Sequence, residues 1–227
     1  LIALWPRVRQ LRRRYRFELI DAHFGHPTAA AAALLSAAFG CPFVVTLRGA
    51  ETRHATYALR RYWMSWALRR ACRVITVSER LRQFAIGLGV APYRVCTIPN
   101  GINIGMFFQR DREAMRGKHR IASHQLMLLS AGNLIELKGH HRIIAALGGL
   151  HRQGISAGLW IVGSAGREGR YEGRIRDLVR EMGIEEHVHF VGSVSQEVLA
   201  EYMSATDVFC LASSREGWPN VVHEALG

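Results

Sequence analysis

Almost every basic residue in this chain is an arginine. There are 28 arginines and two lysines, Lys118 and Lys138. Lys138 follows an expected strand at 126–132 after a short loop and precedes Gly139, which opens an expected helix. An ammonium group at a strand-to-helix turn, beside the free amides of a helix N-terminus, suits a phosphate group. The spacing alone also fits a solvated loop lysine, so Lys138 is a candidate for phosphate binding.

The last fifteen residues, 213–227, contain a second candidate element with the sequence SSREGWPNVVHEALG. Glu216 and Glu224 stand eight residues apart, and Pro219 between them suits the first turn of a helix. Glu224 is then expected about one turn into the helix, and Glu216 in the loop before it. One carboxylate could accept hydrogen bonds from sugar hydroxyls and the other from a ribose. The alternative is an acidic helix cap and a surface glutamate.

The histidines and cysteines do not indicate a metal site. His187, His189 and His223 lack the spacing of metal ligands, and the four cysteines form no CxxC pair. We expect free thiols in a reducing compartment, no metal and no cofactor. His140 and His141 are expected on a helix surface. The Gly-x-x-Gly segment 163–166 is expected to shape a cleft rather than to mark a dinucleotide site.

The elements that must position these side chains alternate along the chain. Strands are expected at 17–22, 42–47, 73–77, 94–99, 126–132, 158–163, 188–192 and 207–212. Helices are expected at 28–39, 51–71, 79–88, 139–153, 170–182, 195–203 and from 219 onward. This alternation predicts an α/β fold with doubly wound parallel sheets, which bind ligands at the carboxyl ends of their strands.

Composition and charge divide the chain into two parts. With 227 residues, 49% hydrophobic and 21% charged, it is neither a disordered tail, a collagen-like rod nor a disulfide miniprotein. Residues 1–104 hold sixteen arginines and four acids, the whole net charge of +12, whereas the remainder is balanced. We therefore predict a domain at 1–104, a linker at 105–120 and a domain at 121–227. The chain opens on Leu1 and stops inside an expected helix, so we expect a piece of a longer protein.

Six segments together resemble one enzyme family. Segments 130–144, 187–195 and 205–227 resemble the C-terminal domain of family 4 glycosyltransferases, which are retaining enzymes of the two-domain GT-B fold. Segments 44–51, 73–82 and 99–103 resemble its N-terminal domain and the approach to the interdomain linker. The resemblance covers residues 17–227 and implies two facing Rossmann-like domains, both incomplete here.

The resemblance implies a role for each matching residue. Lys138 matches the lysine that neutralises the donor diphosphate, Glu216 the glutamate near the transferred sugar, and Glu224 the glutamate that holds the nucleotide ribose. Val191 matches a strand end near the base. The loop whose amides contact sugar and phosphate corresponds to Gly217, Trp218, Pro219 and Asn220. The residues expected on the acceptor side are His23, His26 and Arg48.

Three positions depart from the family pattern. Asn133 stands where many members have an arginine, so one of two expected diphosphate cations is absent or supplied elsewhere. Arg48 replaces a frequent histidine and cannot act as a base. Asn103 stands where the family often has aspartate.

The function implied is transfer of a sugar from a nucleotide sugar to a hydroxyl acceptor with retention, the acceptor being a lipid-linked or polysaccharide precursor. Activity is expected of the complete protein rather than of this piece. One alternative is a GT-B glucan or disaccharide synthase, and another is a non-catalytic module that binds nucleotide sugars or anionic surfaces.

The basic segments bear on where the protein acts. Segments 7–16 and 51–71 combine arginines with aromatic residues, a pattern typical of helices that bind anionic membrane surfaces. We expect a cytoplasmic protein with peripheral contact to the inner face of the plasma membrane. Solvated arginine-rich faces are the alternative, and no specific nucleic acid is expected.

Overall fold

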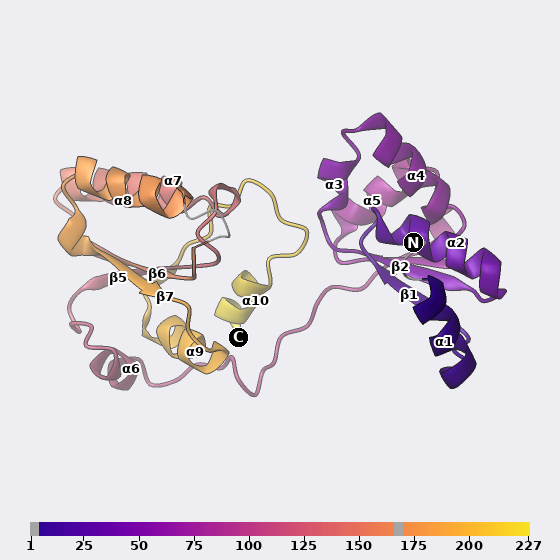
Figure 1. Cartoon of the computed structure of the whole chain (residues 1–227). Coiled ribbons are helices and arrows are strands. Elements are labelled where there is room, and N and C mark those ends of the chain that lie inside the picture. The colour runs from indigo at the N-terminus through magenta and orange to yellow at the C-terminus, as the bar shows by residue number, and fades with distance from the viewer. Residues whose placement is uncertain (1–4, 166–169) are drawn as a thin grey trace. The chain divides into compact units, whose positions relative to one another are not determined.

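The computed structural model describes residues 5–165 and 170–227 (Figure 1). The chain divides into two compact units, Leu1–Asn100 and Gly101–Gly227. Each described unit contains a four-stranded sheet in which all neighbouring strands run parallel. The α/β class predicted from the alternation of apolar runs and helical segments is therefore confirmed.

The first unit has the sheet order β1-β2-β3-β4. Its strands are β1 (Ile20–His23), β2 (Phe43–Leu47), β3 (Arg73–Thr76) and β4 (Val95–Thr97). Its helices are α1 (Trp5–Tyr15), α2 (Thr28–Phe39), α3 (Glu51–His54), α4 (Ala58–Leu68), α5 (Glu79–Gly87) and the 3-10 turn η2 (Pro92–Arg94).

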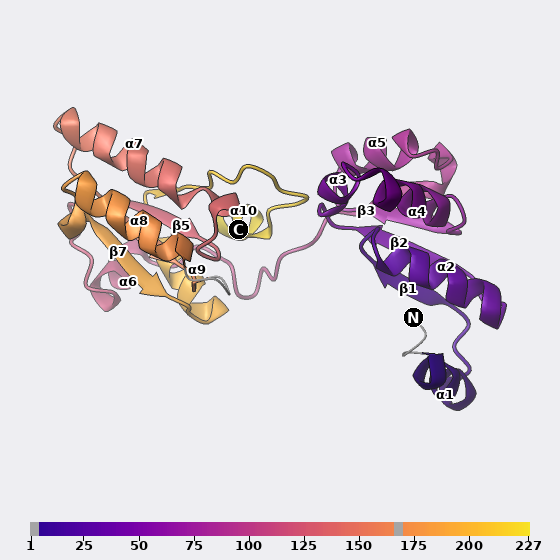
Figure 2. The same ribbon diagram turned by 45° about the horizontal axis from the view of Figure 1, so that its top comes forward.

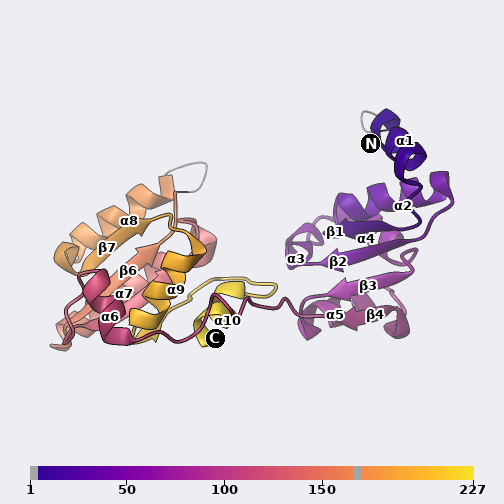
Figure 3. The same ribbon diagram turned by 90° about the horizontal axis from the view of Figure 1, so that it is seen from below.

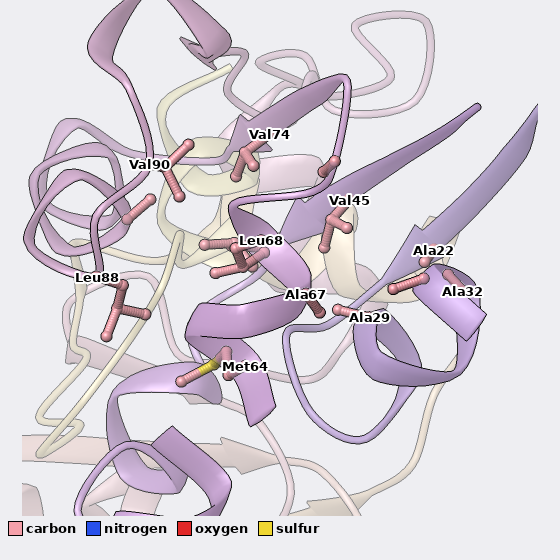
Figure 4. Packing of buried hydrophobic residues seen from close by; sticks show 14 of the residues in the cluster. Ala22, Ala29, Ala32, Val45, Met64, Ala67, Leu68, Val74, Leu88 and Val90 are labelled. Atoms are coloured by element: carbon pink, nitrogen blue, oxygen red, sulfur yellow. The ribbon is translucent and has the colours of Figure 1, made fainter. Parts of the chain in front are cut away.

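Small and β-branched residues build the core of the first unit. Helix α2 is mostly alanine, the best helix former, and it ends at Gly40 in the left-handed conformation. Its alanines allow a close approach to the sheet, where Val45 of β2 and Val74 of β3 are fully buried. Ala67 and Leu68 of α4 complete this cluster (Figure 4).

The second unit has the sheet order β7-β6-β5-β8. Its strands are β5 (Leu126–Ala131), β6 (Ala157–Val162), β7 (Val188–Gly192) and β8 (Val208–Phe209). Its helices are α6 (Arg112–Lys118), α7 (His140–Arg152), α8 (Arg170–Glu181), α9 (Gln196–Ala205) and α10 (Asn220–Leu226), with the 3-10 turns η3 (Glu136–Lys138) and η4 (Glu185–His187).

Helices cover both faces of the second sheet. Helices α7 and α8 lie side by side on one face (Figure 2), where they bury a cluster that includes Ile144 and Ile161. Helices α6, α9 and α10 lie on the other face (Figure 1), against a cluster that includes Leu129 and Trp160. Because β5 and β6 are covered on both sides, they are almost wholly apolar.

The structure corrects two expected elements. The single helix predicted at 51–71 is two helices, because the chain leaves helical geometry at Tyr57, which is extended. The hydroxyl of Thr56 donates to the carbonyl of Arg53, a local bond that competes with continued helix. The strand predicted at 207–212 is shorter in the structure, where β8 comprises Val208–Phe209 and pairs with Leu128 and Leu129 of β5. None of the helices among residues 5–165 and 170–227 is long and apolar enough to cross a membrane.

Helix α6 lies inside the segment predicted as a linker, and it packs against α9. Its Arg116 is 1% exposed and donates to the carbonyls of Ala205, Ser123 and Gln125 and to Asp207. The Asp207 carboxylate also accepts a hydrogen bond from the backbone amide of Met127, the second residue of β5. One buried guanidinium therefore ties α6 to the sheet of the second unit.

Candidate active site

A cavity of about 400 Å³ opens at the carboxyl ends of β5, β6 and β7 in the second unit. This is the edge at which parallel sheets bind ligands. The lining combines small polar groups, two carboxylates and one ammonium group. It consists of Ala131, Gly132, Asn133, Lys138, Val162, Gly163, Ser164, Ser193, Val194, Ser195, Gln196, Leu199, Glu216, Trp218, Pro219, Asn220, Val221 and Glu224.

Lys138 and Glu216 meet directly in this cavity. The Lys138 Nζ lies 2.8 Å from a carboxylate oxygen of Glu216, although 78 residues separate them in the chain. Both side chains remain partly open, at 24% and 23% exposure. Among the described lining residues, Lys138 is the one lysine or arginine. The site therefore holds a charge pair that a ligand can reach.

Backbone contacts bring the two partners together. Lys138 ends η3, and the amide of Ser214 donates to the carbonyl of Leu137, which holds the Glu216 loop against this turn. Gly139 has φ +72°, and a Cβ there would lie 2.0 Å from the carbonyl oxygen of Ala212. A side chain at 139 would push the loop, and Glu216 with it, away from Lys138.

Two glycines that follow β5 and β6 line the cavity near the Lys138–Glu216 pair. Gly132 follows β5 with φ +148°, and Gly163 follows β6 with φ +152°. A Cβ at Gly163 would lie 2.0 Å from the Gly132 carbonyl oxygen, so the two strand ends approach too closely for any other residue. The expectation that 163–166 shapes a cleft fits Gly163 and Ser164, which line the cavity. Gly166 lies outside the described residues.

His140 is buried rather than on the helix surface, so that expectation was wrong. Its Nε2 lies 3.3 Å from the carbonyl oxygen of Asn133, which only accepts, so Nε2 bears the proton. Its Nδ1 then accepts from the hydroxyl of Ser130 at 3.0 Å. Burial lowers the pKa of His140 and favours this neutral ring. His140 thereby fixes the turn that presents Asn133 to the cavity.

Helix α10 presents the second carboxylate. Pro219 precedes its first residue, and Glu224 lies one turn in, half-buried at the cavity wall. Burial raises the pKa of the Glu224 carboxyl. Beside it, the rings of Trp218 and His223 stack 4.1 Å apart and nearly parallel. The stack holds the Trp218 ring against the start of the helix.

Val191 and Gly217, unlike the other residues expected to bind the donor, do not line the cavity. Val191 packs against the apolar cluster between the sheet and α9, and the residues after it, Ser193 to Gln196, line the cavity instead. Gly217 is in the loop between two lining residues but does not line the cavity. Sequence reasoning missed Ser195, whose side chain caps α9; a serine just before an apolar helix was the available signal.

The residues expected on the acceptor side lie at the carboxyl edge of the first sheet. His23 ends β1, His26 follows it, and Arg48 follows β2. The Arg48 Nε donates to His23 Nδ1 at 3.0 Å. Glu51, fully buried, accepts from the amides of Gly25 and Gly49 and so ties the two loops together.

Two family models match successive parts of the chain. The model described as glycosyl transferases group 1 matches residues 111–227, just over half of the chain. The model described as glycosyltransferase family 4 matches residues 1–105. The second match includes the carboxyl edge with His23 and Arg48, and the first includes the whole cavity of the second unit.

Several curated proteins are similar to this chain at low sequence identity. The Bacillus subtilis protein TuaC, provisionally named a teichuronic acid biosynthesis glycosyltransferase, is 28% identical over 92% of this chain and 50% of its own length. The N-acetyl-alpha-D-glucosaminyl L-malate synthase of Bacillus anthracis is 23% identical over 99% of this chain and 58% of its own. The chain thus spans about half the length of these relatives.

Solved structures share the fold. Anabaena HepE, crystallised with UDP, superimposes with a TM-score of 0.84 at 20% identity, over 96% of this chain and 60% of that one. Sucrose-phosphate synthase from Thermosynechococcus elongatus gives 0.85 at 22% identity, over 96% and 56%. The two units therefore correspond to the two Rossmann-like domains of the GT-B fold. Because the group 1 model matches residues 111–227 and the family 4 model matches residues 1–105, the chain belongs to the family 4 (group 1) glycosyltransferases.

Proposed function

We propose that the whole protein transfers a sugar from a nucleoside diphosphate sugar to a hydroxyl acceptor with retention of configuration. The observation that carries this proposal is the pairing of Lys138 with Glu216 inside a cavity that Glu224 also lines. An ammonium group matches the diphosphate, and two carboxylates match the hydroxyls of the sugar and the ribose. The family membership supports the same assignment.

The charge pair suggests how a donor enters. In the structure Lys138 is paired with Glu216. An incoming diphosphate offers Lys138 a doubly charged partner, and the released Glu216 carboxylate can then accept hydrogen bonds from the sugar. As the anomeric carbon–oxygen bond breaks, charge grows on the diphosphate, and the fixed ammonium group stabilises it. The acceptor oxygen bonds to the anomeric carbon, and its proton leaves with the diphosphate.

The two glutamates should give different kinetic signatures. We expect Glu224→Gln mainly to raise the donor KM, because contact with the ribose is the same in the ground and transition states. We expect Glu216→Gln mainly to lower kcat, because this carboxylate lies beside the reacting sugar. Steady-state kinetics on the two purified variants measures the difference. The same change in KM and kcat for both would contradict the division of roles.

Donor binding should weaken in mild acid because of Glu224. The Glu224 carboxylate is proposed to accept hydrogen bonds from the ribose hydroxyls, and burial raises the pKa of this carboxyl group. Donor affinity should therefore be full above the raised pKa and should fall as the pH drops through it. Donor Kd measured from pH 8 to pH 5 should therefore rise in the wild type. Glu224→Gln, which keeps an acceptor oxygen but does not titrate, should flatten the curve. An unchanged pH profile in that variant would assign the titration elsewhere.

The acceptor class is inferred from the chemistry of relatives. Names among them include a teichuronic acid glycosyltransferase and a D-inositol 3-phosphate glycosyltransferase from Geodermatophilus obscurus, which is 26% identical over 67% of this chain and 35% of its own length. These names support a polysaccharide or lipid-linked precursor as acceptor. A glucan or disaccharide synthase is the second candidate, supported by the fold shared with sucrose-phosphate synthase.

Release of nucleoside diphosphate separates a transferase from a binding module. The whole protein should release UDP, GDP or ADP from one member of a panel of UDP-, GDP- and ADP-sugars when an acceptor mixture is present. Release by the wild type and its loss in Glu216→Gln would support the enzyme. Tight donor binding without release under any acceptor would support the binding module instead.

We further propose that the protein works at the cytoplasmic face of the plasma membrane. Helix α4 and its N-cap expose Tyr57, Tyr62 and Trp63, at 54%, 60% and 40%. The exposed Arg61, Arg69 and Arg70 lie in the same segment, and the Arg70 guanidinium stacks on Trp66. Exposed aromatic rings among arginines suit the interface of an anionic bilayer.

Vesicle binding should depend on these arginines. Each arginine near an anionic surface contributes about 1 kcal/mol. We therefore expect the Arg61/Arg69/Arg70→Gln variant to lose binding to phosphatidylglycerol vesicles in co-sedimentation at low salt, where wild type binds. The Arg152/Arg174/Arg180→Gln variant removes equal charge from exposed positions of the second unit and should retain binding. Equal binding of wild type to neutral vesicles would refute the electrostatic contact.

A further inference from the structure

The loop that carries Glu216 has no helix or strand of its own. It spans residues 210–219, between β8 and α10 (Figure 3). The Nη1 atom of Arg142 donates a hydrogen bond to the carbonyl oxygen of Ala212 in this loop at 2.7 Å, across 70 positions of the chain. We call this hydrogen bond the loop clamp. It joins a guanidinium group on α7 to the backbone of the loop just upstream of Glu216.

Helix α7 gives Arg142 a rigid support. Buried Ile144 and Leu147 anchor this helix in the core of the second unit. The backbone amide of Arg142 donates to the carbonyl of Gly139, so Arg142 belongs to the first helical turn, beside the Lys138 turn. The Arg142 side chain therefore extends from a point that is fixed relative to the Lys138 turn.

An arginine in this first turn is unfavourable for the helix itself. The N-terminus of a helix carries a partial positive charge, so cations are favoured at the C-terminus instead. The first turn of α7 contains no acidic residue, and two histidines precede Arg142. A residue that conflicts with its local environment calls for a compensating role elsewhere in the structure. The loop clamp supplies such a role, because a charged donor makes a stronger hydrogen bond.

The loop clamp acts together with a backbone hydrogen bond. The amide of Ser214 donates to the carbonyl of Leu137 at 2.9 Å, two residues further along the loop. These two bonds hold neighbouring parts of the loop against the turn and the helix that follows it. Glu216 comes next in the loop, and its carboxylate meets the Lys138 Nζ at 2.8 Å. Loss of the loop clamp should therefore let Glu216 move away from its present position.

We propose that Arg142 is a positioning residue for sugar transfer, because through the loop clamp it keeps the Glu216 carboxylate where the reacting sugar binds. Arg142 does not line the described cavity, so in this assignment it touches neither donor nor acceptor. The role of Glu216 rests on the proposed transferase function, whereas the hold of Arg142 on the loop does not.

Loss of the loop clamp should affect turnover and nucleotide affinity differently. Arg142→Met keeps an unbranched stem but donates no hydrogen bond. We expect kcat to fall about tenfold, the effect of one hydrogen bond from a charged donor at an exposed position. Nucleotide affinity should not fall, because a displaced Glu216 competes less for Lys138, with which it pairs in the structure. A general structural defect would weaken both turnover and affinity.

Hydrogen exchange of the full chain tests the loop clamp without any turnover. The Ser214 amide should exchange about tenfold faster in Arg142→Met than in the wild type, because the loop opens more easily. Unchanged exchange of the β5 and β6 amides would show that the variant is folded. Arg152→Met, at an exposed position in the last turn of the same helix, should leave Ser214 exchange unchanged. Equal Ser214 exchange in Arg142→Met and the wild type would overturn the proposal.

Nucleotide binding and turnover of the whole protein complete the test. UDP, GDP and ADP are titrated into the wild type, Arg142→Met and Arg142→Lys. Lysine keeps the charge and a donor, so Arg142→Lys should retain kcat within threefold of the wild type. A raised nucleotide Kd in Arg142→Met alone, with unchanged Ser214 exchange, would make Arg142 a diphosphate contact and overturn the positioning role.

The two measurements also separate this proposal from the proposed function. Faster Ser214 exchange in Arg142→Met, with no binding of UDP, GDP or ADP to the wild type, would keep the loop clamp and contradict the transferase. Unchanged Ser214 exchange in a whole protein that binds and turns over a donor would contradict the loop clamp alone.

Discussion

Lys138→Ala should lower turnover by the whole protein about 100-fold. Lys138 is the one cation that lines the described cavity, and the side chain that stands at the second expected cation position is Asn133. We therefore expect this ammonium group to be the chief stabiliser of the charge that grows on the diphosphate. Loss of one preorganised charge contact costs about 3 kcal/mol of transition-state stabilisation. The prediction is tested by measuring kcat and the donor KM of the wild type and of Lys138→Ala at a saturating acceptor concentration.

The chain provides its own control for this experiment. Lys118, the other lysine, forms an ion pair with Glu201 on the surface of the second unit. Lys118→Ala removes the same charge from the same unit, and we expect its activity to equal that of the wild type. If Lys138→Ala retained activity within threefold of wild type, the diphosphate role of Lys138 would be wrong.

Arg116→Met should destabilise the second unit by about 3–5 kcal/mol, the usual cost of removing one partner of a buried charged pair. Methionine fills similar space but donates nothing, so Asp207 and the carbonyls of Ala205, Ser123 and Gln125 lose a buried donor. Hydrogen exchange of the β5 and β6 amides should accelerate more than about 100-fold. The β2 and β3 amides of the first unit should keep their rates.

Arg112→Met is the matched control for Arg116. Arg112 contacts the same carboxylate of Asp207 but is 47% exposed, and exposed pairs contribute less than about 1 kcal/mol. Its effect on exchange in β5 and β6 should therefore be small. Equal acceleration by the two substitutions would mean that Asp207 alone, rather than the burial of Arg116, fixes α6 to the sheet.

Most of the fold could be predicted because each element has a local signal. Buried parallel strands are near-continuous apolar runs, as in β5 and β6, and helices such as α7 begin or end at glycines. The break between α3 and α4 had a weaker signal. It depends on the side-chain bond of Thr56 and on the extended backbone at Tyr57, which composition does not specify.

The site was predictable only where a residue type was unusual or matched a family segment. Lys138 was conspicuous as one of two lysines, and the Glu216 and Glu224 spacing completed the pattern. His140 was not predictable, because its partners Ser130 and Asn133 meet it only after the turn has folded. The burial of Arg116 was not predictable either, because it is one of 28 arginines, most of which are exposed. Long-range contacts, rather than local sequence, bury these two side chains.

The central claim is that the cavity of the second unit binds a nucleoside diphosphate sugar through Lys138. Calorimetric titration of the whole protein with UDP-, GDP- and ADP-sugars tests it most directly, with Lys138→Ala and Lys118→Ala measured in parallel. We predict that one donor binds to the wild type and to Lys118→Ala with equal affinity, and that Lys138→Ala binds it at least tenfold more weakly. Equal affinity in all three proteins, or no binding of any donor to the wild type, would contradict the account.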